Sequence, residues 1–263
     1  MSDAQKYTNK LSGARVLVIG GTSGIGFCVT EACLEHGCKV ILSSSQQSKI
    51  DSSISRLLQS YPSAKDRLTG HPCDLSSPSV EDNIKSLFSN TGTVDHIIFT
   101  AGDRLSTVPL KDATLETIQR AGMVRFNGAL LVAKHGSEHL APGPNSSITL
   151  TTGTVSEKPI AGWTIPASYA AGLQSMMRNL ALDMKPTRVN LISPGLVVTE
   201  LWDWMPKEQL GAFMEEAKRG TTTGEVGRPE DVAEAYLYCM RDRNVTGSLI
   251  GTNGGALLMT GKF

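Results

Sequence analysis

The sequence predicts a three-layer α/β fold, in which a doubly wound, seven-stranded parallel sheet lies between two layers of helices. Short apolar runs alternate along the chain with longer segments of helical length. This alternation is typical of parallel strands joined by crossover helices. A glycine-rich turn follows the first apolar run, and no repeat, low-complexity tract or linker divides the 263 residues. We therefore expect a single domain, which is common for α/β folds of this length.

The predicted strands are short runs rich in Val, Ile and Leu that end in glycine, proline or polar residues. The first reads RVLVI and the sixth reads RVNLI. Strands of parallel sheets read as nearly continuous apolar runs because helices cover both faces of the sheet. The predicted strands, in chain order, are residues 15–19, 39–42, 68–72, 95–100, 147–152, 188–192 and 248–252.

Helices are predicted between these strands, where apolar residues recur at helical spacing. Gly37 ends the first of them, as glycine commonly does at the carboxyl end of a helix. Residues 1–12 carry neither pattern and are expected to form a flexible arm before the domain at 13–263. The predicted helices are residues 25–36, 49–61, 80–88, 114–134 and 168–184.

The charged side chains balance, with 25 Lys and Arg against 25 Asp and Glu. This balance argues against nucleic acid or an anionic membrane as the main partner. The first residues are polar, unlike a signal peptide, and no run approaches the roughly 18 apolar residues of a membrane span. Five cysteines without a CxxC pair are typical of buried thiols in a reducing compartment. We expect a soluble cytoplasmic protein without a metal site, since His135 and His139 lack a third ligand.

A dinucleotide site is predicted at the turn after the first strand, which reads GGTSGIG. Glycines there let the backbone approach a pyrophosphate, and the following helix directs free N–H groups and its positive dipole end at the same phosphates. A glycine-rich turn between an apolar strand and a helix is typical of the Rossmann fold. The residues expected at the pyrophosphate are Gly20, Thr22, Ser23, Gly24 and Ile25.

The end of the second strand is expected to choose between NAD and NADP. A carboxylate there would bond the ribose 2′-hydroxyl and repel a 2′-phosphate. This chain instead has Ser43, Ser44 and Ser45, followed by two glutamines, a further serine and Lys49. These groups accept a phosphate and no acid excludes it, so NADP(H) is favoured. No Arg is present in this segment, and an ordinary polar loop would also fit it.

Further motifs follow the later strands in a fixed order. They are CDL at 73–75, TAG at 100–102, SPG at 193–195, GRPED at 227–231 and TNGG at 252–255. Together with GGTSGIG they resemble the short-chain dehydrogenase/reductase family over nearly the whole chain from Leu11 onward. The resemblance implies that Asp74 contacts the adenine, Ala101 and Gly102 flank the ribose, and Val197 and Thr199 lie at the carboxamide. The remaining implied cofactor contacts are Leu75, Pro194 and Gly195.

The catalytic side chains of that family are replaced at the matching positions. In the family a Tyr protonates the carbonyl oxygen, a Lys lowers the pKa of the Tyr, a Ser polarises the oxygen and an Asn holds a water relay. The motif RNLAL at 178–182 and the spacing from Ser to Tyr set the register. The Tyr, Lys, Ser and Asn positions then fall on Pro166, Ala170, Gly153 and Arg125. A displaced motif at Tyr169 would need a Lys at the position of Leu173.

The remaining chemistry favours a cationic hydride acceptor. An iminium carbon becomes neutral when it accepts hydride from a nicotinamide, so no Tyr is needed. The chain is similar to a fungal subgroup of the family, the NADPH-dependent reductase/Diels-Alderases of indole alkaloid pathways of the malbrancheamide and paraherquamide type. The similarity lies in IGGTSGIGF, FTAGD, GWT, RVNLISPGLVVTE and TNGG. That subgroup has an Asp at the position of Pro166, so this chain departs from it there.

Asp103, Arg125 and Thr152 are the polar candidates for the reaction, beside Pro166 at the former Tyr position. Asp103 would either face a cationic intermediate or form a salt bridge with Arg125 or Arg104. Arg125 would either bond a substrate carbonyl or fill the space of the lost relay. Thr152 lies next to the former Ser position.

The family places a mobile lid over the substrate, here at about residues 200–225. Aromatic and Met side chains near it suit a bulky, flat, apolar small molecule, although an amphipathic lid helix packed on the core would carry the same residues. The candidate substrate contacts are Trp163, Tyr169, Trp202, Trp204 and Met205. Tyr169 would equally serve as helix packing. The family also forms homotetramers or homodimers through its two long helices, here 114–134 and 168–184.

Three functions remain open from the sequence. The first is NADP(H)-dependent reduction of an iminium-like or conjugated intermediate in fungal secondary metabolism, with or without a coupled cyclisation. The second is a redox-neutral cyclase or isomerase that uses the old pocket as a scaffold. The third is a non-catalytic dinucleotide-binding protein. The intact glycine turn and Asp74 favour real nucleotide binding and speak against an abandoned pocket, but they fit turnover and structural use of the nucleotide equally.

Overall fold

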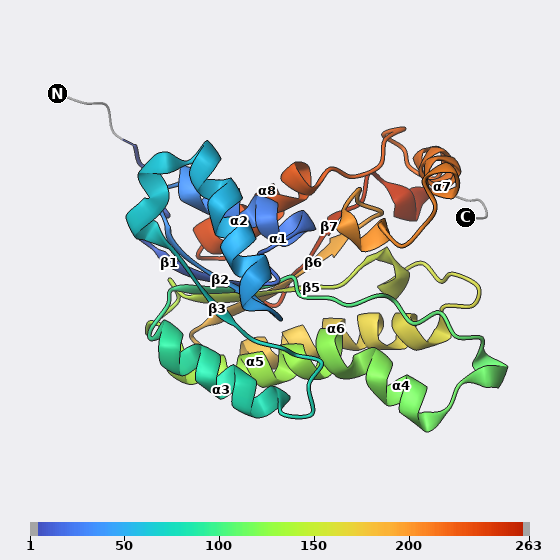
Figure 1. The fold of residues 1–263 in the computed structure, drawn as a ribbon, viewed down its shortest axis with the longest axis horizontal. Coiled ribbons are helices and arrows are strands. Elements are labelled where there is room, and N and C mark those ends of the chain that lie inside the picture. Colours follow the sequence, from blue (N-terminus) through green and yellow to red (C-terminus); the bar gives the residue numbers. More distant parts are fainter. Residues whose placement is uncertain (1–4, 260–263) are drawn as a thin grey trace.

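The fold is a seven-stranded parallel sheet with helices on both faces, as the sequence predicts (Figure 1). In this computed structural model, which describes residues 5–259, every neighbouring pair of strands is parallel. The strand order β3-β2-β1-β4-β5-β6-β7 reverses between β1 and β4, so the sheet is doubly wound about that point. The strands are β1 (Arg15–Ile19), β2 (Lys39–Ser44), β3 (Leu68–Pro72), β4 (His96–Phe99), β5 (Ser147–Thr151), β6 (Arg188–Pro194) and β7 (Leu249–Thr252).

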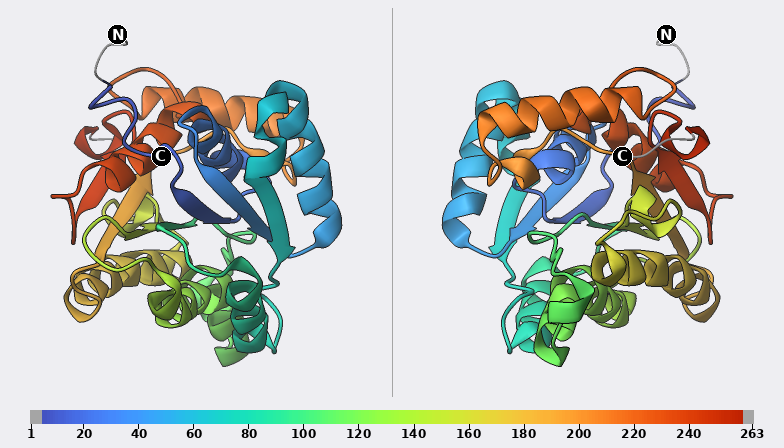
Figure 2. Two further views of the ribbon diagram at one scale, coloured as in Figure 1. Left: turned by 90° about the vertical axis from the view of Figure 1, so that its left-hand side faces the viewer. Right: turned by 90° about the vertical axis from the view of Figure 1, so that its right-hand side faces the viewer.

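Two groups of helices cover the two faces of the sheet (Figures 1 and 2). α1, α2 and α8 pack on one face, and α3, α5 and α6 pack on the other, where α4 extends the layer. α7 stands apart from both layers as part of the expected lid. The helices are α1 (Gly24–Glu35), α2 (Gln47–Ser60), α3 (Val80–Thr91), α4 (Leu115–Gly122), α5 (Ala129–Gly136), α6 (Thr164–Asp183), α7 (Lys207–Arg219) and α8 (Pro229–Arg241).

The core is split between the two faces of the central strands. Val16 and Val18 of β1 belong to the cluster under α1 and α8, whereas Leu17 and Ile19 belong to the cluster under α3, α5 and α6. Successive side chains of a strand point to opposite faces, so both sets are buried. The uninterrupted apolar run of β1 therefore follows from its central position in the sheet.

The long helix predicted over 114–134 is interrupted. α4 ends at Gly122, and a π-helical turn over Met123–Gly128 precedes α5. Tyr169 of α6 packs so tightly on Gly122 that a Cβ there would overlap its ring. Phe126 packs on the same ring, with the ring centres 5.5 Å apart. The π turn thus accommodates packing from α6, and such turns often lie at functional sites.

Two further findings differ from the sequence prediction. α8, which begins with Pro229 after the GRPED motif, was not predicted. The expected arm over 1–12 is anchored at its end, since Leu11 is buried and its carbonyl accepts a hydrogen bond from the Cys38 thiol at 3.3 Å. Residues 1–4 of that arm lie outside the described residues. Among the helices of residues 5–259, none is long and apolar enough to cross a membrane.

The cysteines are buried, and His135 and His139 contact neighbouring side chains. All five cysteines are buried and free of disulfide bonds. His135 bonds Glu81, whereas His139 stacks on Phe88 with the ring centres 5.1 Å apart. Within residues 5–259 no group of three or more His, Cys, Asp and Glu side chains is arranged to hold a metal ion.

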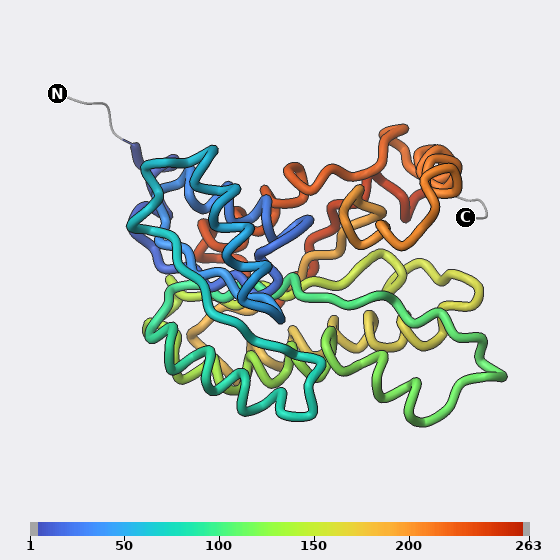
Figure 3. Tube along the Cα trace, viewed as in Figure 1, coloured from blue at the N-terminus to red at the C-terminus, as the bar shows by residue number. Residues whose placement is uncertain are grey.

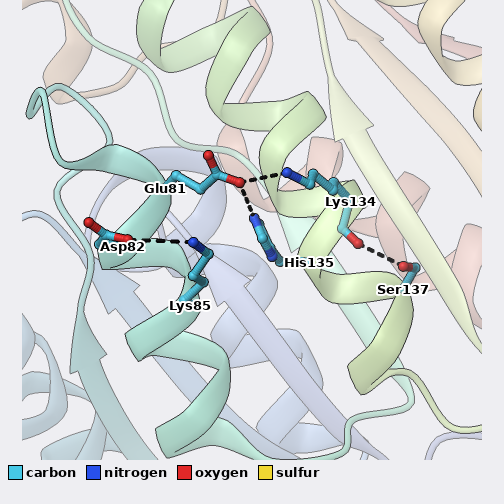
Figure 4. Close-up of polar contacts among 6 residues, drawn as sticks. All are labelled: Glu81, Asp82, Lys85, Lys134, His135 and Ser137. Carbon is cyan, nitrogen blue, oxygen red and sulfur yellow. Dashed lines mark hydrogen bonds and ion pairs between the residues drawn. The ribbon is translucent and has the colours of Figure 1, made fainter.

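A surface ion cluster joins α3 to α5 (Figure 4). The Glu81 carboxylate accepts hydrogen bonds from Lys134 Nζ at 2.6 Å and from His135 Nε2 at 2.8 Å. These hydrogen bonds, that of Lys134 first, lower the pKa of Glu81 to about 2. The cluster is exposed, so its contribution to stability is small.

We expect Glu81→Gln to lower the melting temperature slightly at pH 7. A carboxylate whose pKa is depressed in the folded state contributes stability above its ordinary pKa, and the contribution is lost as the pH falls toward the folded value. The difference between variant and wild type should therefore shrink between pH 4.5 and about 2. Asp82→Asn is the matched control, because Asp82 pairs with Lys85 within α3 alone. A pH-independent difference would contradict this account.

Candidate active site

A cavity of about 1250 Å³ lies at the carboxyl ends of the strands. The loops after β4 and β5 and the lid segment reach the same end of the molecule (Figure 3). In open α/β sheets ligands bind at this edge, at the point where the strand order reverses. Here that point lies between β1 and β4, and the turns after both strands line the cavity.

The glycine turn forms one wall of this cavity. Gly20 has a φ of +91° and lies so close to Ala101 that a Cβ would come within 2.6 Å of the Ala101 backbone nitrogen. Gly26 is in similar contact with the Gly20 carbonyl. Ser23 precedes α1 without a side-chain cap, so the first amides of the helix face the cavity uncapped by their own segment. Such amides, at the positive end of the helix dipole, bind phosphates.

Hydroxyl and basic side chains line the end of the cavity beside β2 and α2. Thr22 Oγ1 donates to Ser44 Oγ at 3.0 Å, and Ser53 Oγ donates to the Thr22 carbonyl at 3.0 Å. The lining residues here are Ser44, Ser45, Ser48, Lys49, Ser52, Ser53 and Arg56. This group has two cations and no carboxylate.

The sequence analysis missed Arg56. Its guanidinium lies over the Phe27 ring of α1, 4.3 Å from the ring centre, and Arg56 lines this end of the cavity. The signal was present, because Lys49, Ser52 and Arg56 recur at helical spacing on one face of α2. Ser43, which the sequence analysis placed in the cofactor site, is not among the residues that line the cavity. It lies within β2, fully buried, and does not line the cavity, because the strand extends to Ser44.

The other expected cofactor positions line the same cavity. Asp74 is held by Ser76, whose backbone N–H and hydroxyl donate to its carboxylate at 2.9 and 2.7 Å. The lining residues that the sequence analysis placed at the nucleotide are Gly20, Thr22, Ser23, Gly24, Ile25, Ser44, Ser45, Asp74, Leu75, Ala101, Gly102, Pro194, Gly195, Val197 and Thr199.

The positions that the sequence analysis matched to the catalytic side chains of the family also line the cavity, and hydroxyl groups beside them bond the scaffold. Pro166 lies in the first turn of α6, where a helix needs no backbone N–H donor. Thr152 Oγ1 donates to the Ala170 carbonyl at 2.8 Å. The Tyr169 hydroxyl donates to the Ile118 carbonyl of α4 at 3.0 Å. Both hydroxyl protons are therefore used to hold α6 in place.

Arg125 and Asp103 form an ion pair at the cavity. The π turn directs Arg125 toward the loop after β4, where its Nη2 donates to the Asp103 carbonyl and its Nε lies 3.5 Å from Asp103 Oδ1. The guanidinium packs on Gly102, where a Cβ would come within 2.5 Å of it. Burial lowers the pKa of Arg125 and the charge of Asp103 raises it. Of the two roles left open for Asp103, the structure contains the salt bridge.

The segment over 200–225, where the sequence analysis expects a lid, carries aromatic side chains with distinct environments. Trp202 is buried, its Nε1 donates to the Val197 carbonyl at 2.9 Å, and its ring packs 5.3 Å from that of Phe213. Trp204 is 50% exposed, and the Arg104 guanidinium lies 4.3 Å from its ring centre. Trp163 lines the cavity from the start of α6.

Met205 does not line the cavity, in contrast to the sequence expectation. It lies in the turn before α7, and its backbone N–H donates to the Trp202 carbonyl at 2.9 Å. The turn therefore places Trp202 and Trp204, and not Met205, beside the cavity.

Comparison with known proteins decides the family. A family described as the SDR-like Rossmann domain matches residues 7–259. The chain is a short-chain dehydrogenase/reductase. The short-chain dehydrogenase/reductase fsr5 of Gibberella fujikuroi is 44% identical over 266 residues, which cover 98% of this chain and 100% of fsr5.

Two solved structures of similar proteins extend the comparison. The MalC reductase/Diels-Alderase of Malbranchea aurantiaca has a TM-score of 0.89 and 38% identity, covering 96% of this chain and 100% of MalC. A small-chain dehydrogenase in complex with NADPH has a TM-score of 0.76 and 30% identity, covering 94% of this chain and 100% of that one. The resemblance inferred from the motifs is thus confirmed, both for the family and for its fungal reductase/Diels-Alderase relatives.

We expect Gly26→Ala to destabilise this short-chain dehydrogenase/reductase by about 1–3 kcal/mol, the usual cost of overpacking. The added Cβ would meet the Gly20 carbonyl, which is backbone and has no rotamer to change. Urea unfolding measures the change. Gly211→Ala in α7 is the control, because nothing lies within 4 Å of its Cβ position. Equal stability of the two variants would refute the packing argument.

Proposed function

We propose that this protein binds NADPH and reduces an iminium-like carbon of a bulky, apolar intermediate in fungal secondary metabolism. One observation carries the proposal: the expected nucleotide-binding residues line one cavity together with Pro166 and Ala170, which the motif register matches to the Tyr and Lys of the family. The family membership supports an oxidoreductase. The substrate class is inferred from the chemistry of the cavity.

The cavity fits a nicotinamide dinucleotide. Gly20 and Gly26 leave space that a Cβ would fill, and the amides at the start of α1, which no side chain of their own segment caps, suit a pyrophosphate. Asp74 and Leu75 would lie at the adenine. Hydroxyls together with the charges of Lys49 and Arg56 suit a 2′-phosphate, so NADPH is preferred to NADH. The relative solved in complex with NADPH supports the same choice.

The residues near the expected nicotinamide favour an acceptor that needs no proton. NADPH supplies a hydride when it is bound. A ketone would become an alkoxide, which requires a donor such as the missing Tyr, whereas an iminium carbon becomes neutral. Thr152 and Tyr169 already donate their protons to backbone carbonyls. The geometry of these residues therefore supports reduction of a cation.

The Arg125–Asp103 pair would orient such a substrate without repelling it. The pair carries no net charge, so a nearby cationic carbon is not opposed by an isolated guanidinium. The side chain of Arg125 is 30% exposed, and N–H groups on that side would bond a substrate carbonyl. Trp163, Trp204 and Phe213 give the cavity apolar walls for a large ring system.

A redox-neutral cyclase is the second candidate. The likeness to the MalC reductase/Diels-Alderase favours it, because that name joins both activities in one protein. Incubation of the enzyme with NADPH and candidate iminium substrates distinguishes the two, with absorbance at the reduced-nicotinamide band followed beside product formation. NADPH loss that matches product supports reduction, and product without NADPH loss supports the cyclase. Failure to bind NADPH would exclude the reductase.

The protein is also expected to assemble as a homodimer or homotetramer through the layer of α4, α5 and α6. This layer exposes Leu115, Leu130 and Leu182, which are 71%, 43% and 69% exposed. Apolar side chains exposed on one layer favour self-association.

Arg56→Ala is expected to weaken NADPH binding about tenfold and to leave NADH binding unchanged, as loss of one charged phosphate contact predicts. Titration of both nucleotides measures the effect. Lys65→Ala removes an exposed charge away from the cavity and serves as the control. An equal loss for NADPH and NADH would show that Arg56 does not read the 2′-phosphate.

Arg125→Ala is expected to lower kcat about 100-fold, in the range found for loss of one preorganised donor, with little change in nucleotide affinity. Arg125→Lys should recover part of the loss because it restores the charge without the planar donor pair. Arg120→Ala on α4, which does not line the cavity, is the control. Unchanged turnover in Arg125→Ala would remove its role in orienting the substrate.

A further inference from the structure

A carboxylate from the lid lies at the amino end of α1. The backbone N–H of Gly24, the first residue of that helix, donates to Glu200 Oε2 at 2.8 Å. Ser23 makes no side-chain cap there, so the Glu200 carboxylate acts as the cap. Within residues 5–259 Glu200 forms no ion pair with a basic side chain. A backbone amide and the helix dipole therefore hold its charge.

This is the position that the glycine turn prepares for a pyrophosphate. Gly24 and Glu200 both line the cavity. A carboxylate and a phosphate that accept from the same N–H would compete for it, and their negative charges would repel each other. A nucleotide that reaches the start of α1 must therefore displace Glu200.

Displacement of Glu200 would act on the lid. Glu200 begins the 3₁₀ turn that leads to Trp202. Its neighbour Thr199 packs closely on Gly24, because a Cβ on Gly24 would come within 3.0 Å of the Thr199 methyl carbon. The other end of the lid is tied elsewhere, since Thr222 donates through its backbone N–H and its hydroxyl to the Gly254 carbonyl at 2.8 and 3.0 Å. One end of the lid segment is thus bonded, through Glu200, to the Gly24 amide that is expected to bind the nucleotide.

We propose that Glu200 is a built-in anion that holds the lid segment on α1 until the pyrophosphate of the nucleotide displaces it. The lid therefore responds to whether the nucleotide is present. This inference rests on the proposed function only in requiring that a nucleotide binds. Glu200 thereby weakens nucleotide binding and couples that binding to the position of the lid segment.

Two ligands separate the inference from the proposed function. NADPH carries a pyrophosphate, whereas adenosine 2′-monophosphate reaches the adenine and 2′-phosphate positions without one. Glu200→Gln and Glu200→Ala should bind NADPH about five- to tenfold more tightly than the wild type, as loss of one competing charge predicts. Their affinity for adenosine 2′-monophosphate should stay unchanged. Glu208→Gln, a change at an exposed lid carboxylate that does not line the cavity, should alter neither affinity.

Thermal unfolding gives a second readout. Loss of the cap should lower the melting temperature of the free Glu200→Ala protein, whereas the saturated protein should match the wild type, so the shift caused by NADPH increases. Unchanged or weaker NADPH affinity in both Glu200 variants would overturn the inference, as would equal tightening for adenosine 2′-monophosphate. A wild type that binds neither ligand would instead refute the proposed function.

Discussion

The site depends on a backbone contact between the glycine turn and the turn that leaves β4. A Cβ on Gly20 would meet the backbone of Ala101, and one on Gly26 would meet the Gly20 carbonyl. Backbone atoms have no alternative rotamer, so only glycine fits at both positions. The contact holds the turns after β1 and β4 together where the strand order reverses, and it places the start of α1 at the cavity. The anion-binding amides, and with them the nucleotide position, follow from this one constraint.

The residues at and beside the positions matched to the catalytic side chains of the family have well-defined contacts in the scaffold. Pro166 occupies a helix turn that tolerates it, and Thr152 bonds the helix carbonyl at Ala170. Arg125 lies in the π turn, where it meets Asp103. This part of the cavity therefore contains a compensated ion pair and apolar walls. Under the proposed function, such surroundings suit a substrate whose charge disappears during the reaction.

The fold was predictable where the evidence is local. Apolar runs such as RVLVI and a glycine turn beside a helix depend on residues close together in the chain, and the structure confirms them. The π turn within the helix predicted over 114–134 was not predictable from local sequence, and it follows Gly122, on which Tyr169 of a different helix packs. Likewise Arg188 reads as the start of a strand, yet its guanidinium donates to the Met240 carbonyl at the end of α8.

The sequence by itself determined the sheet, the place of the nucleotide loop and the residues that stand at positions 166 and 170. Those conclusions rest on periodicity and on spacing along the chain, which the sequence contains in full. Only the tertiary structure decided that the Arg56 guanidinium lies over Phe27 of a different helix and that Glu200 caps Gly24, which is 176 residues away. Such contacts depend on how separate helices and loops pack together in space, and no pattern within one segment encodes that packing.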